Sequence, residues 1–300
     1  HNFDGLRMLA VAQKNQIREA GAFDVSDEQN MVLMGFIGFL DPPKQSAAAA
    51  ITALNEHGVR VVVLTGDSEG VAVKVCSKVG VPTEHCLTGV DVEAMSDKAL
   101  IRAVRECCLF SKLSPAQKQR VVAAFQANGH TVGYMGDGIN DTLAMRQSDV
   151  GISVDSAVDI AKETADIILL KKDLMVLEEG VLEGRRTFGN IMKYIKMAAS
   201  GNFGNMISVV LASILLPFLP LKPVQILTQN LLCDFAQLGI PFDRVDESYL
   251  SQPRKWDTGS IQKFMFSMGP LSCIFDLCCY AILWWAMGAN SMEHAALFQC

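Results

Sequence analysis

The stretch MGDGINDTLAM, from Met135 to Met145, decides the fold and points to the chemistry of this chain. It ends an apolar run with a glycine turn and places two carboxylates, Asp137 and Asp141, four residues apart with Asn140 between them. Oxygen donors of this kind suit a hard divalent cation such as Mg²⁺. A single Asp-Gly turn is usually a plain loop, so its meaning depends on the segments around it.

Apolar strands and helical segments alternate on both sides of this stretch. An apolar strand at Leu33–Pro43, expected to be buried, ends in two prolines, and a β-branched strand is expected at Val59–Asp67. Further strands are expected at CLFSKL, TVGYMGDG, GISV and DIILL, with a helix capped by Ser114 and opened by Pro115 between the first two. The alternation predicts an α/β domain in which helices cover both faces of a parallel sheet. In such a sheet the active site lies at the carboxyl ends of the strands.

Polar residues gather at three such places. Thr65, Gly66 and Asp67 end one strand, Lys118 lies on the helix after Ser114, and the Asp-Gly turn described above ends another strand. A threonine hydroxyl and backbone N–H groups can hold phosphoryl oxygens, and a lysine supplies positive charge to the transferring group. Together the three places predict phosphoryl transfer assisted by Mg²⁺.

The composition changes after about residue 197. Hydrophobic residues make up 50% of the chain, and long apolar runs with almost no charge follow that point. Three membrane spans are expected, at about 197–217, 224–240 and 264–287, the first continuing a stalk that starts near Leu174. The alternative is a set of buried helices in a large soluble protein.

Charge and cysteine content narrow the function further. The net charge of −6, from 26 basic and 32 acidic residues, does not favour nucleic-acid binding. Nine cysteines form no CxxC pair, which indicates reduced, structural thiols. Basic residues before the first span and between the second and third place the soluble part and the loop 243–263 in the cytoplasm.

Polar side chains within the expected spans predict an ion pathway. Asn202 and Asn205 share one face of the first span, and Asn230 and Asp234 share one face of the second. We expect them to form a divalent-cation site across the two helices, with interhelical hydrogen bonding as the alternative. For Asp276 on the third span three roles stay open: an ion ligand, a group that supports a ligand, and a packing partner.

With the sequences DPP at 41–43, TGD at 65–67, SPAQKQRVV around Lys118 and MGDGINDTLAM in this order, followed by apolar spans, the chain resembles the P-type cation-transporting ATPases. The resemblance implies a haloacid-dehalogenase-like phosphorylation domain followed by an α-helical transmembrane region. It also implies an aspartyl-phosphate intermediate, ATP as substrate and a catalytic Mg²⁺ ion. The implied organisation is the tail of a nucleotide-binding domain at 1–32, the second half of the phosphorylation domain at 33–175, and stalk and spans at 176–300.

The resemblance also implies roles for single residues. Asp137 would bind the catalytic Mg²⁺, with Asp141 as a second ligand or orienting group. Asp67 would support the site and the nucleotide, and Arg7 would reach the ATP phosphates. The residues that would contact the phosphoryl group are Thr65, Gly66, Lys118 and Asn140.

One departure from the family pattern is large. Neither the DKTG motif, whose aspartate is the family's nucleophile, nor the TGE motif occurs in these residues. We therefore expect the chain to be a piece of a longer pump, with both ends cut from it, and to be unable to hydrolyse ATP alone.

The membrane half is similar to the bacterial magnesium-importing members. Calcium pumps carry Asn-x-x-Glu where this chain has Asn202-Phe-Gly-Asn205, so one carboxylate is replaced by an amide. This favours a pump in the bacterial inner membrane that imports Mg²⁺, surrounded by lipid and completed by the missing N-terminal part. The alternatives are another divalent-cation pump such as a Ca²⁺ pump, a membrane-anchored haloacid-dehalogenase-like phosphatase, and a non-catalytic membrane subunit.

Overall fold

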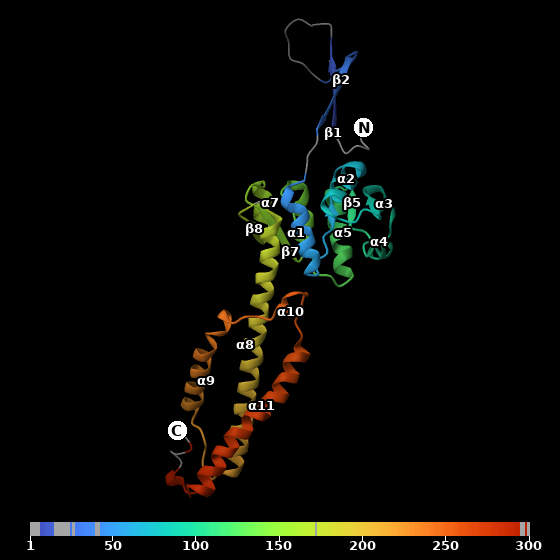
Figure 1. The fold of residues 1–300 in the computed structure, drawn as a ribbon. Helices are drawn as coiled ribbons and strands as arrows, with labels where there is room; N and C mark the ends of the chain where they lie inside the picture. Colours follow the sequence, from blue (N-terminus) through green and yellow to red (C-terminus); the bar gives the residue numbers. More distant parts are fainter. Residues whose placement is uncertain are drawn as a thin grey trace. The chain divides into compact units, whose positions relative to one another are not determined.

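The computed structural model describes residues 7–14, 25, 28–39, 43–171, 173–294 and 298. The chain divides into two compact units, His1–Gly180 and Val181–Cys300 (Figure 1). The division falls close to the start of the predicted stalk. Each unit has its own architecture.

The first unit begins with a two-stranded antiparallel sheet. β1 (Arg7–Gln13) pairs with β2 (Val32–Phe39), with Arg7 opposite Phe39. The strand predicted at Leu33–Pro43 forms as β2, but the expectation that it is buried was wrong: seven of the eight residues of β2 are exposed. Among the described residues, no third strand joins this sheet, so its apolar side chains remain uncovered.

The five predicted parallel strands, with a sixth that was not predicted, form two three-stranded sheets. The first contains β3 (Val63–Leu64), β4 (Cys86–Thr88) and β5 (Leu109–Ser111) in the order β3-β5-β4, and the second contains β6 (Gly133–Met135), β7 (Val150–Val154) and β8 (Ile167–Leu169) in the order β6-β7-β8. All their pairings are parallel. β5 is buried along its whole length, whereas Ile167 and Ile168 of β8 are exposed.

The helices of this unit carry apolar faces onto these strands. They are α1 (Gln45–Glu56), α2 (Glu69–Val79), α3 (Gly89–Ala94), α4 (Asp97–Ala103), α5 (Pro115–Ala127), α6 (Thr142–Gln147) and α7 (Asp159–Thr164). Phe110 at the centre of β5 is fully buried among side chains of α4 and α5. The predicted cap of α5 is confirmed: Ser114 accepts a hydrogen bond from the backbone N–H of Gln117, and Pro115 is the first helical residue.

The described cysteines are all free thiols, as predicted. Cys76 on α2 is buried, and burial raises the pKa of its thiol to about 11. At neutral pH this thiol is therefore protonated and packs as a small apolar group.

The second unit is helical. α8 (Leu174–Leu215) enters it, and it continues with α9 (Pro223–Gln237), the short helices η4 (Ile240–Phe242) and α10 (Glu247–Leu250), α11 (Thr258–Ala281), the π-helical turn η5 (Ile282–Ala286) and η6 (Met292–His294). In the described residues, two helices are long and apolar enough to cross a membrane, Leu174–Leu215 and Thr258–Ala286. In the most apolar 18-residue stretch of each helix, only 22% and 11%, respectively, is buried inside the protein. A core helix of a soluble domain is mostly buried.

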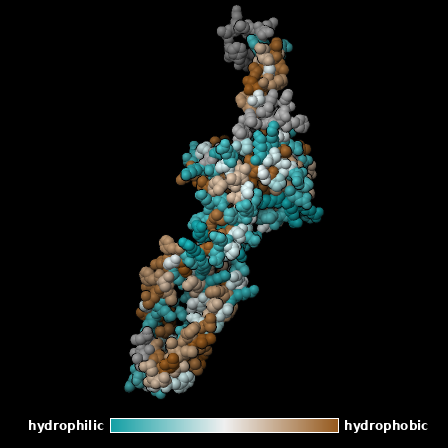
Figure 2. Space-filling model, viewed as in Figure 1, coloured by the Kyte–Doolittle hydropathy of each residue, from teal (hydrophilic) through white to brown (hydrophobic). Residues whose placement is uncertain are grey.

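The second predicted span is shorter than expected. α9 has 15 residues, a length of about 22 Å, whereas the hydrocarbon layer is about 30 Å thick. Its exposed apolar side chains include Val224, Leu227 and Leu231, and Figure 2 shows hydrophobic side chains gathered over α9 and α11. This uncovered apolar surface is what a lipid-facing helix requires.

The loop after α9 returns to the part of α8 that precedes the predicted first span. Lys193 binds the carboxylate of Asp243 at 2.7 Å, and Arg185 donates to the carbonyl of Leu250 at 2.6 Å. The basic residues of the stalk and those of this loop therefore lie at the same end of the unit, as the positive-inside argument requires.

α8 and α11 approach each other most closely at two glycines, Gly204 and Gly269. A β-carbon on Gly204 would lie 2.7 Å from the carbonyl oxygen of Gly269, and one on Gly269 would lie 2.7 Å from the ring of Phe203. The two backbones are thus nearly in contact, which small residues allow in membrane helices.

Replacing Gly204 with Ala is expected to destabilise the second unit by about 1–3 kcal/mol, because the added methyl group collides with backbone. The matched control is Gly201→Ala, one turn earlier, where a β-carbon meets nothing within 4 Å. That change is expected to be neutral or stabilising by up to about 1 kcal/mol. Thermal unfolding of the purified protein measures both. Equal melting temperatures for the two variants would contradict the close crossing.

Candidate active site

A lysine–aspartate pair lies at the end of β6. α5 presents Lys118, and the turn after β6 presents Asp141 at the end of η3 (Ile139–Asp141). The Lys118 Nζ lies 2.7 Å from Asp141 Oδ1, and the two side chains are only 10% and 15% exposed. Low exposure strengthens their attraction, so the lysine is held as a fixed positive charge at the sheet edge.

Tyr134 joins this pair and was not predicted. Its hydroxyl donates to the same Asp141 Oδ1 at 2.9 Å. Burial, and then the negative charge of Asp141, raise the pKa of Tyr134 above its ordinary value, so the phenol stays a neutral donor. The only signal in the sequence was its position in the strand preceding the Asp-Gly turn, which also fits a simple core residue.

Gly136 makes room for Asp141. A β-carbon at this position would lie 2.4 Å from Asp141 Cβ, closer than real side chains approach. The carbonyl of Gly136 accepts a hydrogen bond from the buried hydroxyl of Ser153 on β7 at 3.0 Å. This hydrogen bond to β7 fixes the backbone of the turn, so the turn cannot move away from a side chain added at Gly136.

Gly136→Ala is expected to displace Asp141 from Lys118 and to destabilise the first unit by about 1–3 kcal/mol, the usual cost of overpacking. The control is Gly133→Ala in β6, where the nearest atom, Ile152 Cδ1, lies at an ordinary 3.7 Å. The measurements are urea unfolding and phosphoenzyme formation of the full-length protein. A Gly136→Ala protein with the stability and phosphorylation of the control would contradict this geometry.

Thr65 and Asp67 form a second polar turn, at the end of β3. The Thr65 hydroxyl donates to Asp67 Oδ2 at 3.2 Å, and the Asp67 N–H donates to Thr65 Oγ1 at 3.1 Å. The carbonyl of Thr65 accepts from the N–H of Leu113, which precedes the cap of α5. The turn that carries Thr65 is thus tied by backbone to the helix that carries Lys118.

The remaining predicted active-site residues lie at the surface. Asp137 and Asn140 are exposed, as is Gly66. No group of three or more His, Cys, Asp or Glu side chains able to hold a metal occurs among the described residues. The donor chemistry still fits Mg²⁺ in part, because Asp137 is exposed and Asp141 keeps one oxygen that neither Lys118 nor Tyr134 uses. Mg²⁺ usually takes one or two carboxylates and retains water.

β3 and β6, which lead into these two turns, are both edge strands of their sheets. Leu64 of β3 nevertheless packs against the core cluster that contains Tyr134 of β6. Edge strands of parallel sheets are normally covered or paired. Within the described residues, these two edges have no further strand.

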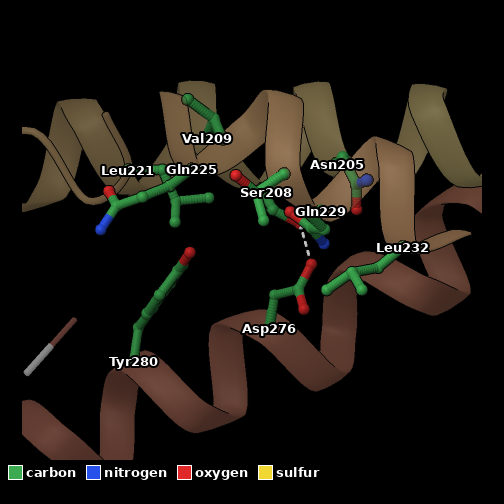
Figure 3. Close-up of a pocket in the computed structure, with 10 residues that line it drawn as sticks. Asn205, Ser208, Val209, Leu221, Gln225, Gln229, Leu232, Asp276 and Tyr280 are labelled. Atoms are coloured by element: carbon green, nitrogen blue, oxygen red, sulfur yellow. Dashed lines mark hydrogen bonds between the residues drawn. The ribbon is translucent and has the colours of Figure 1, made fainter. Parts of the chain in front are cut away.

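In the second unit, one pocket of about 450 Å³ lies among the helices. Asn205 lines it, together with Gln229 and Asp276 (Figure 3). Asn202, Asn230 and Asp234 do not line this pocket. Gln229 and Asn230 are adjacent in α9, so their side chains point about 100° apart.

The shared site expected between Asn205 and Asp234 stays a prediction, because Asn205 lines the pocket and Asp234 does not. The pocket takes Gln225 and Gln229 from α9, whereas Asp234 projects from a different side of that helix. Asp234 and Asn202 are exposed in the described residues. Sequence spacing fixed which residues share a helix face, but not which face meets α8.

Two parts of the motif set lie outside the described residues. They are the side chain of Arg7 and Asp41 of the DPP sequence. Their expected roles in the site stay predictions.

Comparison with known proteins agrees with this geometry. The haloacid dehalogenase-like hydrolase family matches residues 6–149, and the family described as "Cation transporting ATPase, C-terminus" matches residues 218–300. The fold thus defines a haloacid-dehalogenase-like domain followed by helices that are apolar enough to cross a membrane. The chain belongs to the P-type cation-transporting ATPases.

Its relatives include two magnesium transporters and more distant calcium pumps. "Magnesium-transporting ATPase, P-type 1" of Salmonella typhimurium strain LT2 is 51% identical over 301 residues, covering 100% of this chain and 33% of the relative. The protein of the same name from Escherichia coli strain K12 is 51% identical, covering 99% and 33%. "Endoplasmic reticulum calcium ATPase srcA" of Aspergillus fumigatus is 32% identical, covering 84% and 28%. The chain spans about a third of the length of these relatives.

Proposed function

We propose that this chain works as part of an ATP-driven membrane pump that forms an aspartyl-phosphate and imports Mg²⁺. The observation that carries the proposal is the Lys118–Asp141 pair, with a separation of 2.7 Å, at the end of β6. It provides a fixed positive charge beside oxygen donors, which is what a transferring phosphoryl group requires. Thr65, Gly66 and Asn140 would contact that group, and Asp67 would support the turn that holds Thr65.

Mg²⁺ and ATP complete the site in this proposal. Asp137, with the remaining oxygen of Asp141, would hold the catalytic Mg²⁺, which would neutralise charge on the phosphoryl oxygens. The chain's own residues position the phosphoryl group, and Asp141 holds the side chain of Lys118 in place. Arg7 would contact ATP.

The nucleophilic aspartate would come from polypeptide outside these 300 residues. Neither DKTG nor TGE occurs in the sequence, and the relatives are about three times as long. The uncovered edges of β3 and β6 favour a strand that pairs there and delivers the aspartate to the sheet edge. We propose residues 1–32 as the tail of the nucleotide-binding domain, 33–175 as phosphorylation domain, and 176–300 as stalk and membrane region.

Mg²⁺ is favoured over Ca²⁺ as the transported ion. The magnesium transporters are 51% identical to the chain, whereas the calcium pump from Aspergillus fumigatus is 32% identical. The amide at Asn205 supports the same choice, because Ca²⁺ prefers sites with more carboxylates. We place the protein in the bacterial inner membrane as a multi-pass protein with a cytoplasmic soluble part. Asn202, Asn205, Asn230 and Asp234 would line the ion path, and lipid would surround the helices.

The test is ATP-dependent uptake of radioactive Mg²⁺ into membrane vesicles of both orientations that contain the full-length protein. We expect uptake in the orientation that corresponds to import, and none in a Lys118→Met protein. Accumulation of Ca²⁺ but not Mg²⁺ would favour the calcium-pump alternative. Hydrolysis of phosphate esters without any cation movement would favour the anchored phosphatase.

A further inference from the structure

The pocket among the three long helices holds a carboxylate that the family motifs do not explain. Asp276 of α11 points into it, and its Oδ2 lies 2.6 Å from the hydroxyl of Ser208 on α8 (Figure 3). Ser208 is buried, and Asp276 is half-buried. A carboxylate at this depth of an apolar helix is costly and needs a compensating partner.

None of the described residues that line this pocket has a basic side chain. Apart from Asp276, its polar lining is neutral and rich in oxygen. The polar residues are Asn205, Ser208, Gln225, Thr228, Gln229, Asp276 and Tyr280. The described lining therefore supplies no counter-charge to the negative charge of Asp276, and it contains hydroxyl and amide oxygens.

The position of Asp276 follows from the glycine crossing. Ser208 lies one helical turn after Gly204, and Asp276 lies two turns after Gly269. Because Gly204 and Gly269 bring the two backbones into contact, the side chains beyond the crossing face one another across a short gap. The hydrogen bond between Ser208 and Asp276 is thus set by the packing of α8 on α11.

The hydroxyl of Ser208 has one proton and two acceptors within reach. The carbonyl of Gly204 lies at 3.0 Å and Asp276 Oδ2 at 2.6 Å. A charged acceptor at the shorter distance receives the stronger hydrogen bond. Ser208 therefore orients the carboxylate toward the pocket while Asn205, one turn earlier on α8, contributes its amide to the same lining.

We propose that Asp276 is the carboxylate ligand of a divalent-cation site between α8, α9 and α11, taking a partly hydrated ion such as Mg²⁺. The inference rests on the proposed function and adds a residue from the third long helix to its ion path. The cavity is large enough, because six waters at about 30 Å³ each need about 180 Å³ and the cavity holds about 450 Å³. Mg²⁺ gives up its water reluctantly and binds through one or two carboxylates, so one aspartate among neutral oxygens suits it.

The experiment is equilibrium dialysis of radioactive Mg²⁺ against the detergent-solubilised full-length protein without nucleotide. All variants carry Asp137→Asn, so that the proposed catalytic Mg²⁺ site is weakened throughout. Asp276→Asn keeps the size of the side chain and an oxygen that accepts from Ser208, but removes the charge. We expect it to weaken binding at least tenfold, and Asp276→Glu to restore part of it.

The matched control is Asp257→Asn, the same exchange at the cap of the same helix and outside the pocket, where the side chain accepts from the N–H of Gly259. It is expected to bind as the parent does. If the parent binds Mg²⁺ and Asp276→Asn binds it equally well, this inference is overturned and the proposed pump function is unaffected. Thermal unfolding checks that each variant is folded. A parent that binds no Mg²⁺ here and takes up none in vesicles would overturn both proposals.

Discussion

Replacing Lys118 with Met in the full-length protein is expected to slow phosphoenzyme formation by roughly 100- to 1,000-fold, the usual effect of removing a fixed charge from a phosphoryl-transfer site. The methionine keeps most of the apolar stem but cannot bind Asp141, which Lys118 contacts at 2.7 Å. Among the described residues, it also leaves this mostly buried carboxylate with Tyr134 as its remaining side-chain donor. Rapid-quench measurement of phosphoenzyme from ATP gives the rate.

The same change should also destabilise the first unit by about 2–4 kcal/mol, because one partner of a mostly buried ion pair is lost. Lys162→Met is the control. Lys162 pairs with Asp159 three residues earlier on α7, where the aspartate is 93% exposed, so its loss should change stability by less than about 0.5 kcal/mol. If Lys118→Met formed phosphoenzyme as fast as the control variant, Lys118 would have no role in phosphoryl transfer.

Replacing Asp234 with Asn is expected to abolish Mg²⁺ uptake while leaving the nucleotide site intact. A carboxylate within an apolar membrane helix is costly, so the presence of Asp234 in α9 points to use in the ion path. Asp234 is exposed in the described residues and lies outside the pocket of Asp276. We infer that it meets ion ligands from polypeptide outside this chain.

The readout is ATP-driven uptake of radioactive Mg²⁺ into vesicles, with nucleotide binding measured in parallel. Asp246→Asn is the control, because Asp246 lies in the loop after α9 and outside the long helices. It should transport at the parent's rate. Undiminished uptake by Asp234→Asn would remove Asp234 from the proposed path, whereas loss of nucleotide binding would indicate a folding defect.

Local patterns predicted most of the soluble fold. The cap at Ser114, the apolar strand before Gly136 and the order of motifs were sufficient to place α5, β6 and the turn between Asp137 and Asp141. These features depend on residues close together in the chain. These local features therefore do not depend on how distant parts of the chain pack.

Long-range packing could not be predicted in the same way. The expected burial of the strand at Leu33–Pro43 was wrong because burial depends on what covers a sheet, and the described chain supplies only β1 as a partner. The role of Tyr134 likewise depends on where its hydroxyl points once β6 has paired with β7.

The membrane half shows the same limit. Helical spacing predicts Asn202 with Asn205 and Asn230 with Asp234 on common faces, yet it could not say which face of α9 meets α8. That choice depends on the glycine contact between α8 and α11 and on the side chains that fill the pocket. Asp276 could be noticed as a buried carboxylate in the sequence, but its partner Ser208 came only from the structure.

The most direct test of the account is to locate the phosphorylated residue in the full-length protein. The protein would be phosphorylated with ATP, the aspartyl-phosphate reduced with borohydride to homoserine, and the modified peptide identified by mass spectrometry. We predict a single modified aspartate that lies outside these 300 residues, and its formation slowed by roughly 100- to 1,000-fold in Lys118→Met. Modification of Asp67, Asp137 or Asp141 would contradict the account, because this chain would then contain its own nucleophile.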